Sequence, residues 1–77
     1  MHPGEVLTEL YMNPLQLSSS KLAKALGVPR SRVEQILGGK SKITTDTARR
    51  LARVFRTSPE LWLKMQNAHD LQKDRPA

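Results

Sequence analysis

The chain lacks cysteine and has only three aromatic residues among its 77. The absence of cysteine excludes a disulfide scaffold, a zinc finger of the cysteine type and a thiol nucleophile. No apolar run approaches the roughly 18 residues needed to cross a bilayer, and the N-terminus has neither the basic nor the apolar region of a secretion signal. The cytosol is therefore the expected compartment. A chain this short has a modest core and little room for a preorganised active site.

Catalytic and metal-binding patterns are also missing. His2 and His69 are too few and too far apart to predict a metal site, and both are expected at the surface. The serines at 18–20 have no nearby histidine or paired acid to activate them. Residues 38–41 lack the first glycine and the preceding strand of a phosphate-binding loop. We therefore expect no enzymatic activity, no cofactor, no metal and no small-molecule substrate.

Positive charge is concentrated in the middle of the chain, although the net charge is +6 overall. Residues 21–56 carry ten bases and two acids, whereas the two flanks together carry three bases and five acids. Such a concentration of positive charge favours binding to a polyanion such as a nucleic acid, because each neutralised phosphate releases condensed counterions. A solubilising surface is the alternative, since many basic domains bind no nucleic acid.

Helical spacing of apolar residues recurs five times, and no useful stretch alternates with period two, so we predict an all-α fold. The first helix is expected from about Gly4 to Met12. It should end at Asn13-Pro14, because proline disfavours helix at the residue before it. The second is expected over residues 19–26, with an N-cap among the serines at 18–20 and a left-handed cap at Gly27.

The sequence is consistent with two different starts for the third helix. Pro29 suits a first helical position, whereas residues 31–34 match a capping box. We favour the earlier start because it gives a helix of usable length before Gly38-Gly39 ends it.

Two more helices complete the predicted domain, which covers residues 1–71. Thr44 should cap the fourth, with Asp46 in its first turn favouring the positive end of the helix dipole. Ser58-Pro59-Glu60 opens the fifth, which continues to about Leu71. Residues 72–77 are expected to form a polar, frayed tail.

The join between the second and third helices is only three or four residues long. This is the helix-turn-helix pattern, whose second helix fits a major groove. An αα-hairpin made for packing alone is the alternative, but it needs neither a small residue where the helices cross nor a glycine four positions later. The predicted core of the motif comprises Leu22, Ala23, Leu26, Gly27, Val28, Val33 and Ile36.

The outer face of the third helix would then meet the base edges. The candidates for base contact are Arg30, Ser31, Glu34 and Gln35. Arginine can bond guanine bidentately, glutamine can bond adenine, and glutamate can accept from cytosine. The alternative for each is a solvated surface residue, and Glu34 could simply bond to Arg30 one turn earlier.

A second set of residues is predicted to contact the phosphate backbone. The candidates are Ser19, Ser20, Arg32, Lys40 and Lys42. The two serines lie at the positive end of the second helix, although capping alone explains them equally well. The lysines lie in a flexible basic loop that leaves the third helix, a plausible backbone clamp. The arginines of the fourth helix are either further backbone contacts or ordinary solvated charge.

Residues 19–38 resemble the helix-turn-helix of the XRE, or lambda-repressor-like, family. A wider resemblance, to the HigA/VapI branch of that family, covers nearly the whole chain, and residues 57–63 are its most discriminating part. It rests on His2-Pro3-Gly4-Glu5, Leu7, Leu22-Ala23-x-x-Leu26-Gly27-Val28, Gly39-Lys40, Ile43-Thr44, Ala48-x-x-Leu51-Ala52, Thr57-Ser58-Pro59-Glu60-Leu61-Trp62-Leu63, Gln66-Asn67 and Asp70-Leu71.

The resemblance implies a five-helix antitoxin of a type II toxin–antitoxin pair. Such proteins form homodimers, repress their own operon at a palindromic operator, and hold a RelE/HigB-like mRNA interferase inactive. The sequence departs from the family pattern at Pro29, where relatives often have a serine cap. Many relatives also continue beyond their fifth helix, where an extension for dimerisation or toxin binding would lie.

A dimer is also expected because a single helix-turn-helix covers only a half-site. Leu61, Trp62 and Met65 could form an apolar dimer interface on the fifth helix, but we favour Trp62 as the main core residue. Two other functions are kept open. One is a stand-alone XRE-type transcriptional regulator without a toxin. The other is a protein-interaction module that has lost DNA binding, against which the basic middle of the chain argues.

Overall fold

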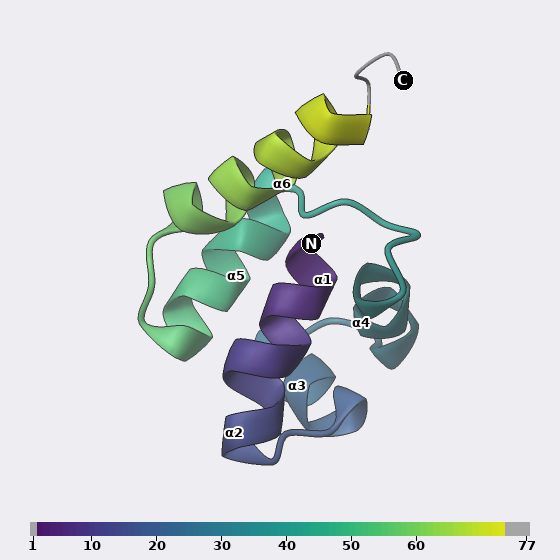
Figure 1. The fold of residues 1–77 in the computed structure, drawn as a ribbon. Helices are drawn as coiled ribbons and strands as arrows, with labels where there is room; N and C mark the ends of the chain where they lie inside the picture. Colours follow the sequence, from purple (N-terminus) through teal and green to yellow (C-terminus); the bar gives the residue numbers. More distant parts are fainter. Residues whose placement is uncertain (1, 74–77) are drawn as a thin grey trace.

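The computed structural model describes residues 2–73, which form five helices and no strand (Figure 1). The first helix is one continuous run of three parts, α1 (Pro3–Val6), the π-helical η1 (Leu7–Met12) and α2 (Asn13–Leu15). The others are α3 (Ser19–Leu26), α4 (Arg30–Leu37), α5 (Thr45–Phe55) and α6 (Pro59–Lys73). The predicted all-α class and the five helices are confirmed. None of the described helices is long and apolar enough to span a membrane.

The first helix does not end at Asn13-Pro14, so that prediction was wrong. It continues through Leu15 and ends at Gln16, whose backbone is left-handed with φ of 55°. In a regular α-helix the ring of Pro14 would meet the carbonyl four residues earlier. The residues before Asn13 form a π turn instead, in which the Asn13 N–H reaches back five residues to the carbonyl of Thr8. We attribute the continuation to this wider turn.

Local capping residues set the starts of the other helices. The hydroxyls of Ser18, Thr44 and Ser58 each accept a backbone N–H from three residues ahead. The earlier start of α4 is confirmed, although Pro29 is its N-cap and Arg30 its first helical residue. At the other end of the chain, α6 runs through Lys73, beyond the predicted end at Leu71. The last four residues of the predicted tail, 74–77, lie outside the described residues.

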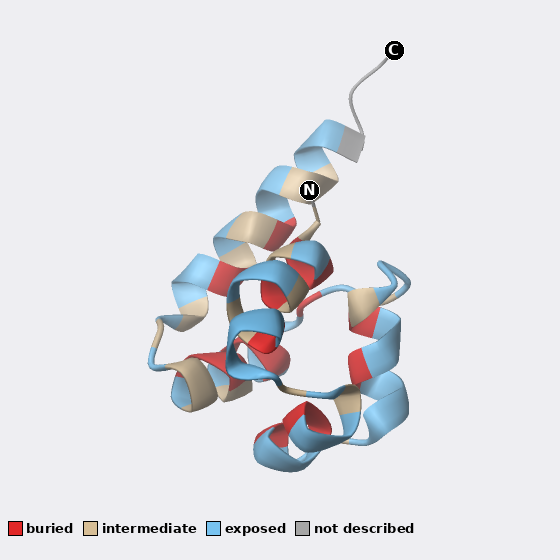
Figure 2. Ribbon diagram, turned by 60° about the horizontal axis from the view of Figure 1, so that its bottom comes forward, coloured by how far each residue is buried: buried red, intermediate tan, exposed pale blue. Residues whose placement is uncertain are grey.

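The core lies where the inner faces of the helices meet (Figure 2). Trp62 is fully buried and its ring lies 5.3 Å from that of Tyr11 and 6.4 Å from that of Phe55. Its indole N–H donates to the Thr57 hydroxyl at 2.8 Å, so its one polar atom is satisfied. Trp62 is therefore the core residue that we favoured.

The N-terminal segment His2-Pro3-Gly4 packs against the end of α4. His2 caps α1, because its Nδ1 accepts the Gly4 N–H at 3.0 Å. A Cβ at Gly4 would overlap the carbonyl oxygen of Ile36 in α4, so only glycine allows this approach. The close contact anchors the C-terminal end of α4 to α1.

The sequence predicted that the two histidines lie far apart and at the surface, and this prediction was wrong. The rings of His2 and His69 lie 5.8 Å apart, edge to face, and both residues are half-buried. The prediction failed because α1 and α6, at opposite ends of the chain, pack side by side. Within residues 2–73, no three or more His, Cys, Asp or Glu side chains are grouped so that they could hold a metal ion.

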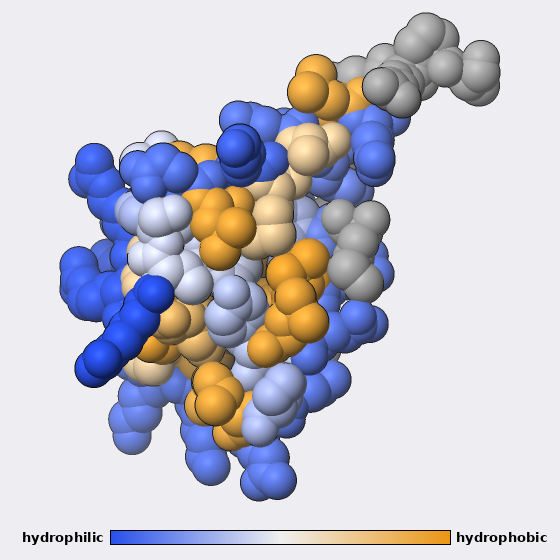
Figure 3. Space-filling model, turned by 60° about the vertical axis from the view of Figure 1, so that its left-hand side comes forward, coloured by the Kyte–Doolittle hydropathy of each residue, from blue (hydrophilic) through white to orange (hydrophobic). Residues whose placement is uncertain are grey.

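Apolar side chains also reach the surface on the side of α2 and α6 (Figure 3). Leu10 and Leu15 on the first helix are largely exposed, and Leu61 on α6 is 39% exposed. Met65 is half-buried against the core. Of the three candidates for a dimer interface, only Leu61 and Met65 therefore reach the surface, and Trp62 does not.

Candidate nucleic-acid interface

The two helices α3 and α4 are joined by a tight turn at Gly27. This glycine is left-handed, with φ of 73°, and its N–H bonds to the carbonyls of Ala23 and Lys24 at 2.9 and 3.3 Å. The Val28 N–H also reaches Ala23, at 3.1 Å. Five of the seven residues predicted as the core of the motif are buried, Val28 is half-buried, and Gly27 lies exposed in the turn. The buried ones are Leu22, Ala23, Leu26, Val33 and Ile36.

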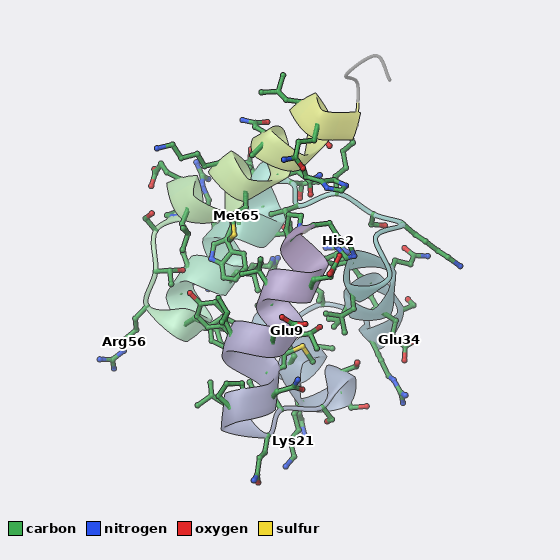
Figure 4. The ribbon with its side chains drawn as sticks, viewed as in Figure 1. His2, Glu9, Lys21, Glu34, Arg56 and Met65 are labelled. Atoms are coloured by element: carbon green, nitrogen blue, oxygen red, sulfur yellow. The ribbon has the colours of Figure 1, made fainter. Side chains whose placement is uncertain are left out.

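The outer face of α4 is exposed and polar (Figure 4, where Glu34 points away from the body). All four residues predicted to contact bases lie on it, namely Arg30, Ser31, Glu34 and Gln35. Arg30 Nε donates to Glu34 Oε1 at 2.9 Å, so the one-turn ion pair does form. The two side chains are 64% and 51% exposed. A pair this exposed is worth about 0–1 kcal/mol, so both ends can exchange it for base edges.

The loop after α4 folds back onto the end of that helix. Gly39 is left-handed with φ of 75°, and the N–H groups of Lys40 and Ser41 both bond to the carbonyl of Gln35. The Ser41 hydroxyl lies 3.2 Å from the side-chain oxygen of Gln35. The beginning of the loop therefore has a defined position beside the outer face of α4.

An open groove of about 530 Å³ runs between α4, the loop and the start of α5. It brings together two predicted base contacts, Ser31 and Gln35, and two predicted backbone contacts, Arg32 and Lys42. Lys40 lines a shallower hollow on the outer face of α4, with Ser31, Glu34 and Gln35. Three candidates line neither hollow: Arg30 at the start of α4, and Ser19 and Ser20 in the first turn of α3.

The cations in the groove are paired with acids. Arg32 Nη1 lies 3.9 Å from Asp46 Oδ2, and Lys42 Nζ lies 3.4 Å from Asp70 Oδ2. A hydrogen bond from Gln66, together with the nearby Lys42 ammonium, holds the pKa of the Asp70 carboxyl below its usual value despite its partial burial. The groove is therefore less positive than its basic residues alone suggest.

Gln66 on α6 is a residue of this site that the sequence analysis missed. Its buried side-chain oxygen accepts the Ile43 N–H at 2.9 Å, and its amide nitrogen donates to Asp70 Oδ1 at 3.0 Å. Since Asp70 also pairs with Lys42, α6 holds both the backbone and a cation of the loop after α4. The only sequence signal was the place of Gln66 in the family resemblance.

Arg50 on α5 is the second residue missed. It donates from Nη1 to the Leu26 carbonyl at 2.8 Å and from Nε to Asp46 at 2.9 Å. From the sequence, the arginines of this helix could be either DNA contacts or solvated charge. Arg50 contacts the turn of the helix-turn-helix, which periodicity within α5 could not indicate.

A family model described as helix-turn-helix matches residues 9–62. Virulence-associated protein I of Dichelobacter nodosus is 49% identical, over 94% of this chain and 67% of its own length. Antitoxin HigA-1 of Vibrio cholerae is 36% identical, over 94% of this chain and 68% of its own. The chain spans 64% of an uncharacterised helix-turn-helix regulator of Haemophilus influenzae, at 44% identity, so it covers about two thirds of such relatives.

Solved structures of similar proteins have the same fold. The antitoxin HigA of Pseudomonas aeruginosa, solved with the higBA promoter, is 34% identical with a TM-score of 0.92, over 95% of this chain and 79% of that one. The antitoxin GraA, solved in complex with its operator, is 40% identical with a TM-score of 0.89, over 95% and 74%. The chain, with its left-handed turn between α3 and α4, thus belongs to the helix-turn-helix family, in the XRE branch that includes the HigA antitoxins.

Proposed function

We propose that this protein is a sequence-specific DNA-binding repressor and the antitoxin of a type II, HigBA-like toxin–antitoxin module. The observation that carries the proposal is the exposed outer face of α4, which presents arginine, glutamate and glutamine beside a groove with further cations. These are the side chains that read guanine, cytosine and adenine in the major groove. Relatives of known structure with promoter or operator DNA support the same activity here.

In this proposal α4 enters the major groove. Arg30, Glu34 and Gln35 bind base edges, and the exposed pair between the first two opens when each meets its base. Ser31 contacts a base edge beside them. The backbone contacts that set the register are Ser19, Ser20, Arg32, Lys40 and Lys42.

Two copies would bind a palindromic operator, because one recognition helix reads one half-site. Leu61 and Met65, exposed or half-exposed on α6, are the proposed contacts between the copies. The second proposed partner is a RelE/HigB-like toxin, which the protein would hold inactive. The protein would meet both the operator DNA and the toxin in the cytoplasm. Neither role requires a catalytic centre.

A stand-alone regulator is the second candidate function. Uncharacterised helix-turn-helix transcriptional regulators of Haemophilus influenzae and Escherichia coli are 44% and 42% identical to this chain, more than the Vibrio cholerae antitoxin at 36%. Both functions include binding to an operator, but only the antitoxin also binds a toxin. Co-expression with the product of the neighbouring gene separates them, because only an antitoxin restores growth and copurifies with that product.

DNA binding is tested by titrating the protein into a labelled duplex from its own upstream region and into a scrambled duplex, at about 0.15 M salt. We expect binding to the upstream duplex to be tighter by tens-fold or more, because specific binding exceeds non-specific binding by large factors. Equal, weak binding to both duplexes would mean that the basic middle of the chain is non-specific. The protein-interaction module would then be the better interpretation.

A further inference from the structure

We propose that Arg50 is a positioning residue that fixes the angle between α3 and α4, and that Asp46 holds its guanidinium in place. The inference rests on the DNA-binding function proposed above and identifies what aims its recognition helix. It concerns a side chain outside both hollows beside α4.

Arg50 binds the turn of the helix-turn-helix directly. Its Nη1 donates to the carbonyl of Leu26, the last residue of α3, at 2.8 Å and lies 3.4 Å from the carbonyl of Gly27. The last carbonyls of a helix have no partner within the helix, and a cation there also suits the negative end of the helix dipole. Arg50 therefore caps α3 from a helix that is distant in the sequence.

The guanidinium also occupies the space over Gly27. A Cβ at this position would lie 3.2 Å from Arg50 Nη1, tighter than ordinary contact. The left-handed backbone favours glycine at this position, and a Cβ would also require the end of the Arg50 side chain to move by a few tenths of an ångström. The hydrogen bond from Arg50 thus links α5 to the end of α3.

Asp46 orients this guanidinium. It lies one helical turn before Arg50, and its Oδ2 accepts from Arg50 Nε at 2.9 Å. The same oxygen lies 3.9 Å from Arg32 Nη1 on α4. Since the planar guanidinium donates in fixed directions, an acceptor on one edge sets where the other edge points. Asp46 and Arg50 together join α3, α4 and α5.

On the α4 side of the turn, no side chain caps the start of the helix. Pro29, the N-cap of α4, makes no side-chain capping hydrogen bond. Base readout depends on bidentate geometry, whereas phosphate contacts carry no sequence information. A change in the angle of α4 should therefore reduce discrimination between sequences more than it reduces general affinity for DNA.

Arg49 provides a matched control. It is exposed on the same helix next to Arg50, carries the same charge, and forms no ion pair with any residue of the range 2–73. Arg49→Ala should weaken binding to the upstream and scrambled duplexes by the same factor. Arg50→Ala removes the same charge, but it should also lower the ratio of the two affinities by about tenfold.

Asp46→Ala tests the inference with the opposite charge change. This substitution makes the protein more positive, so an electrostatic role alone predicts tighter binding to both duplexes. Positioning predicts instead that the affinity ratio falls, as it does for Arg50→Ala. Asp46 is mostly exposed, so this variant should fold even if Arg50→Ala does not. Circular dichroism of each variant at the assay temperature verifies folding.

The outcomes separate this inference from the function on which it rests. If wild-type protein binds both duplexes equally, the proposed function is wrong. If wild-type protein discriminates while Arg50→Ala, Arg49→Ala and Asp46→Ala all keep its affinity ratio, the positioning role is wrong and the function stands. A direct check is the amide spectrum without DNA, in which the Gly27 and Val28 signals should shift in Arg50→Ala and stay in place in Arg49→Ala.

Discussion

At the scale of single residues, the side chains proposed to read bases are held by weak, solvent-exposed interactions. The exposed pair of Arg30 and Glu34 and the contact of Gln35 with Ser41 hold the reading side chains beside one another without burying them. An unpaired, freely rotating side chain would lose more conformational entropy on binding DNA. The free protein is therefore partly preorganised for base contact, at little cost in desolvation.

Replacing Gln35 or Lys40 by alanine should change DNA binding in different ways. Gln35→Ala removes a base contact, so preference for the correct base at one operator position should fall by about 1–3 kcal/mol. Lys40→Ala removes a backbone contact, so all duplexes should be bound more weakly by a similar factor. Competition titrations with operators mutated at single positions measure both effects. If the two variants behave alike, α4 is not the reading helix.

At the scale of helices, local signals predicted most boundaries. Ser18, Thr44 and Ser58 cap the helices that the sequence assigned to them, and Gly27 has the expected left-handed backbone. These features depend on residues within one turn of each other, which periodicity and capping rules can detect. The helix around Pro14 was mispredicted because those rules assume regular α-helical geometry and cannot anticipate a π turn.

Contacts between helices were not predictable in the same way. The family motif at His2-Pro3-Gly4 could be noticed as a pattern, but its role depends on the carbonyl of Ile36 more than thirty positions away. Arg50 and Gln66 also act on backbone groups more than twenty positions distant. The outer face of α4 was predictable because it belongs to one helix, whereas the residues that hold it in place come from the others.

Gln66 should contribute to stability through the loop after α4. Gln66→Leu removes the acceptor of the buried Ile43 N–H, and an unsatisfied buried donor costs about 1–3 kcal/mol. Asn67→Leu, an exposed change on the same helix, should stay within about 0.5 kcal/mol of the wild type. Urea denaturation midpoints compare the three proteins. Equal midpoints would show that the loop does not depend on Gln66.

At the scale of the whole molecule, the charge is divided between a basic middle and acidic flanks. The fold brings the flanks back to the middle, since Asp70 on α6 pairs with Lys42 in the loop. Asp46, one of the two acids of the middle segment, pairs with Arg50 and lies beside Arg32. The described structure therefore neutralises part of the basic field near the groove. Arg32 and Lys42 therefore have to exchange these acids for phosphate when DNA binds.

The small number of proposed cationic backbone contacts predicts a moderate dependence of DNA binding on salt. Each phosphate that a cation neutralises contributes about −0.9 to the slope of log affinity against log salt concentration. Arg32, Lys40 and Lys42 as the cationic backbone contacts give about −3 per protomer, whereas contact by all ten bases would give about −9. Titrations of the upstream duplex between about 0.05 and 0.2 M salt measure the slope. Lys64→Ala, an exposed change on α6 away from the groove, should leave it unchanged. A slope near −9, or one that Lys64→Ala reduces, would mean that DNA wraps a much larger part of the surface than the face of α4 and its groove.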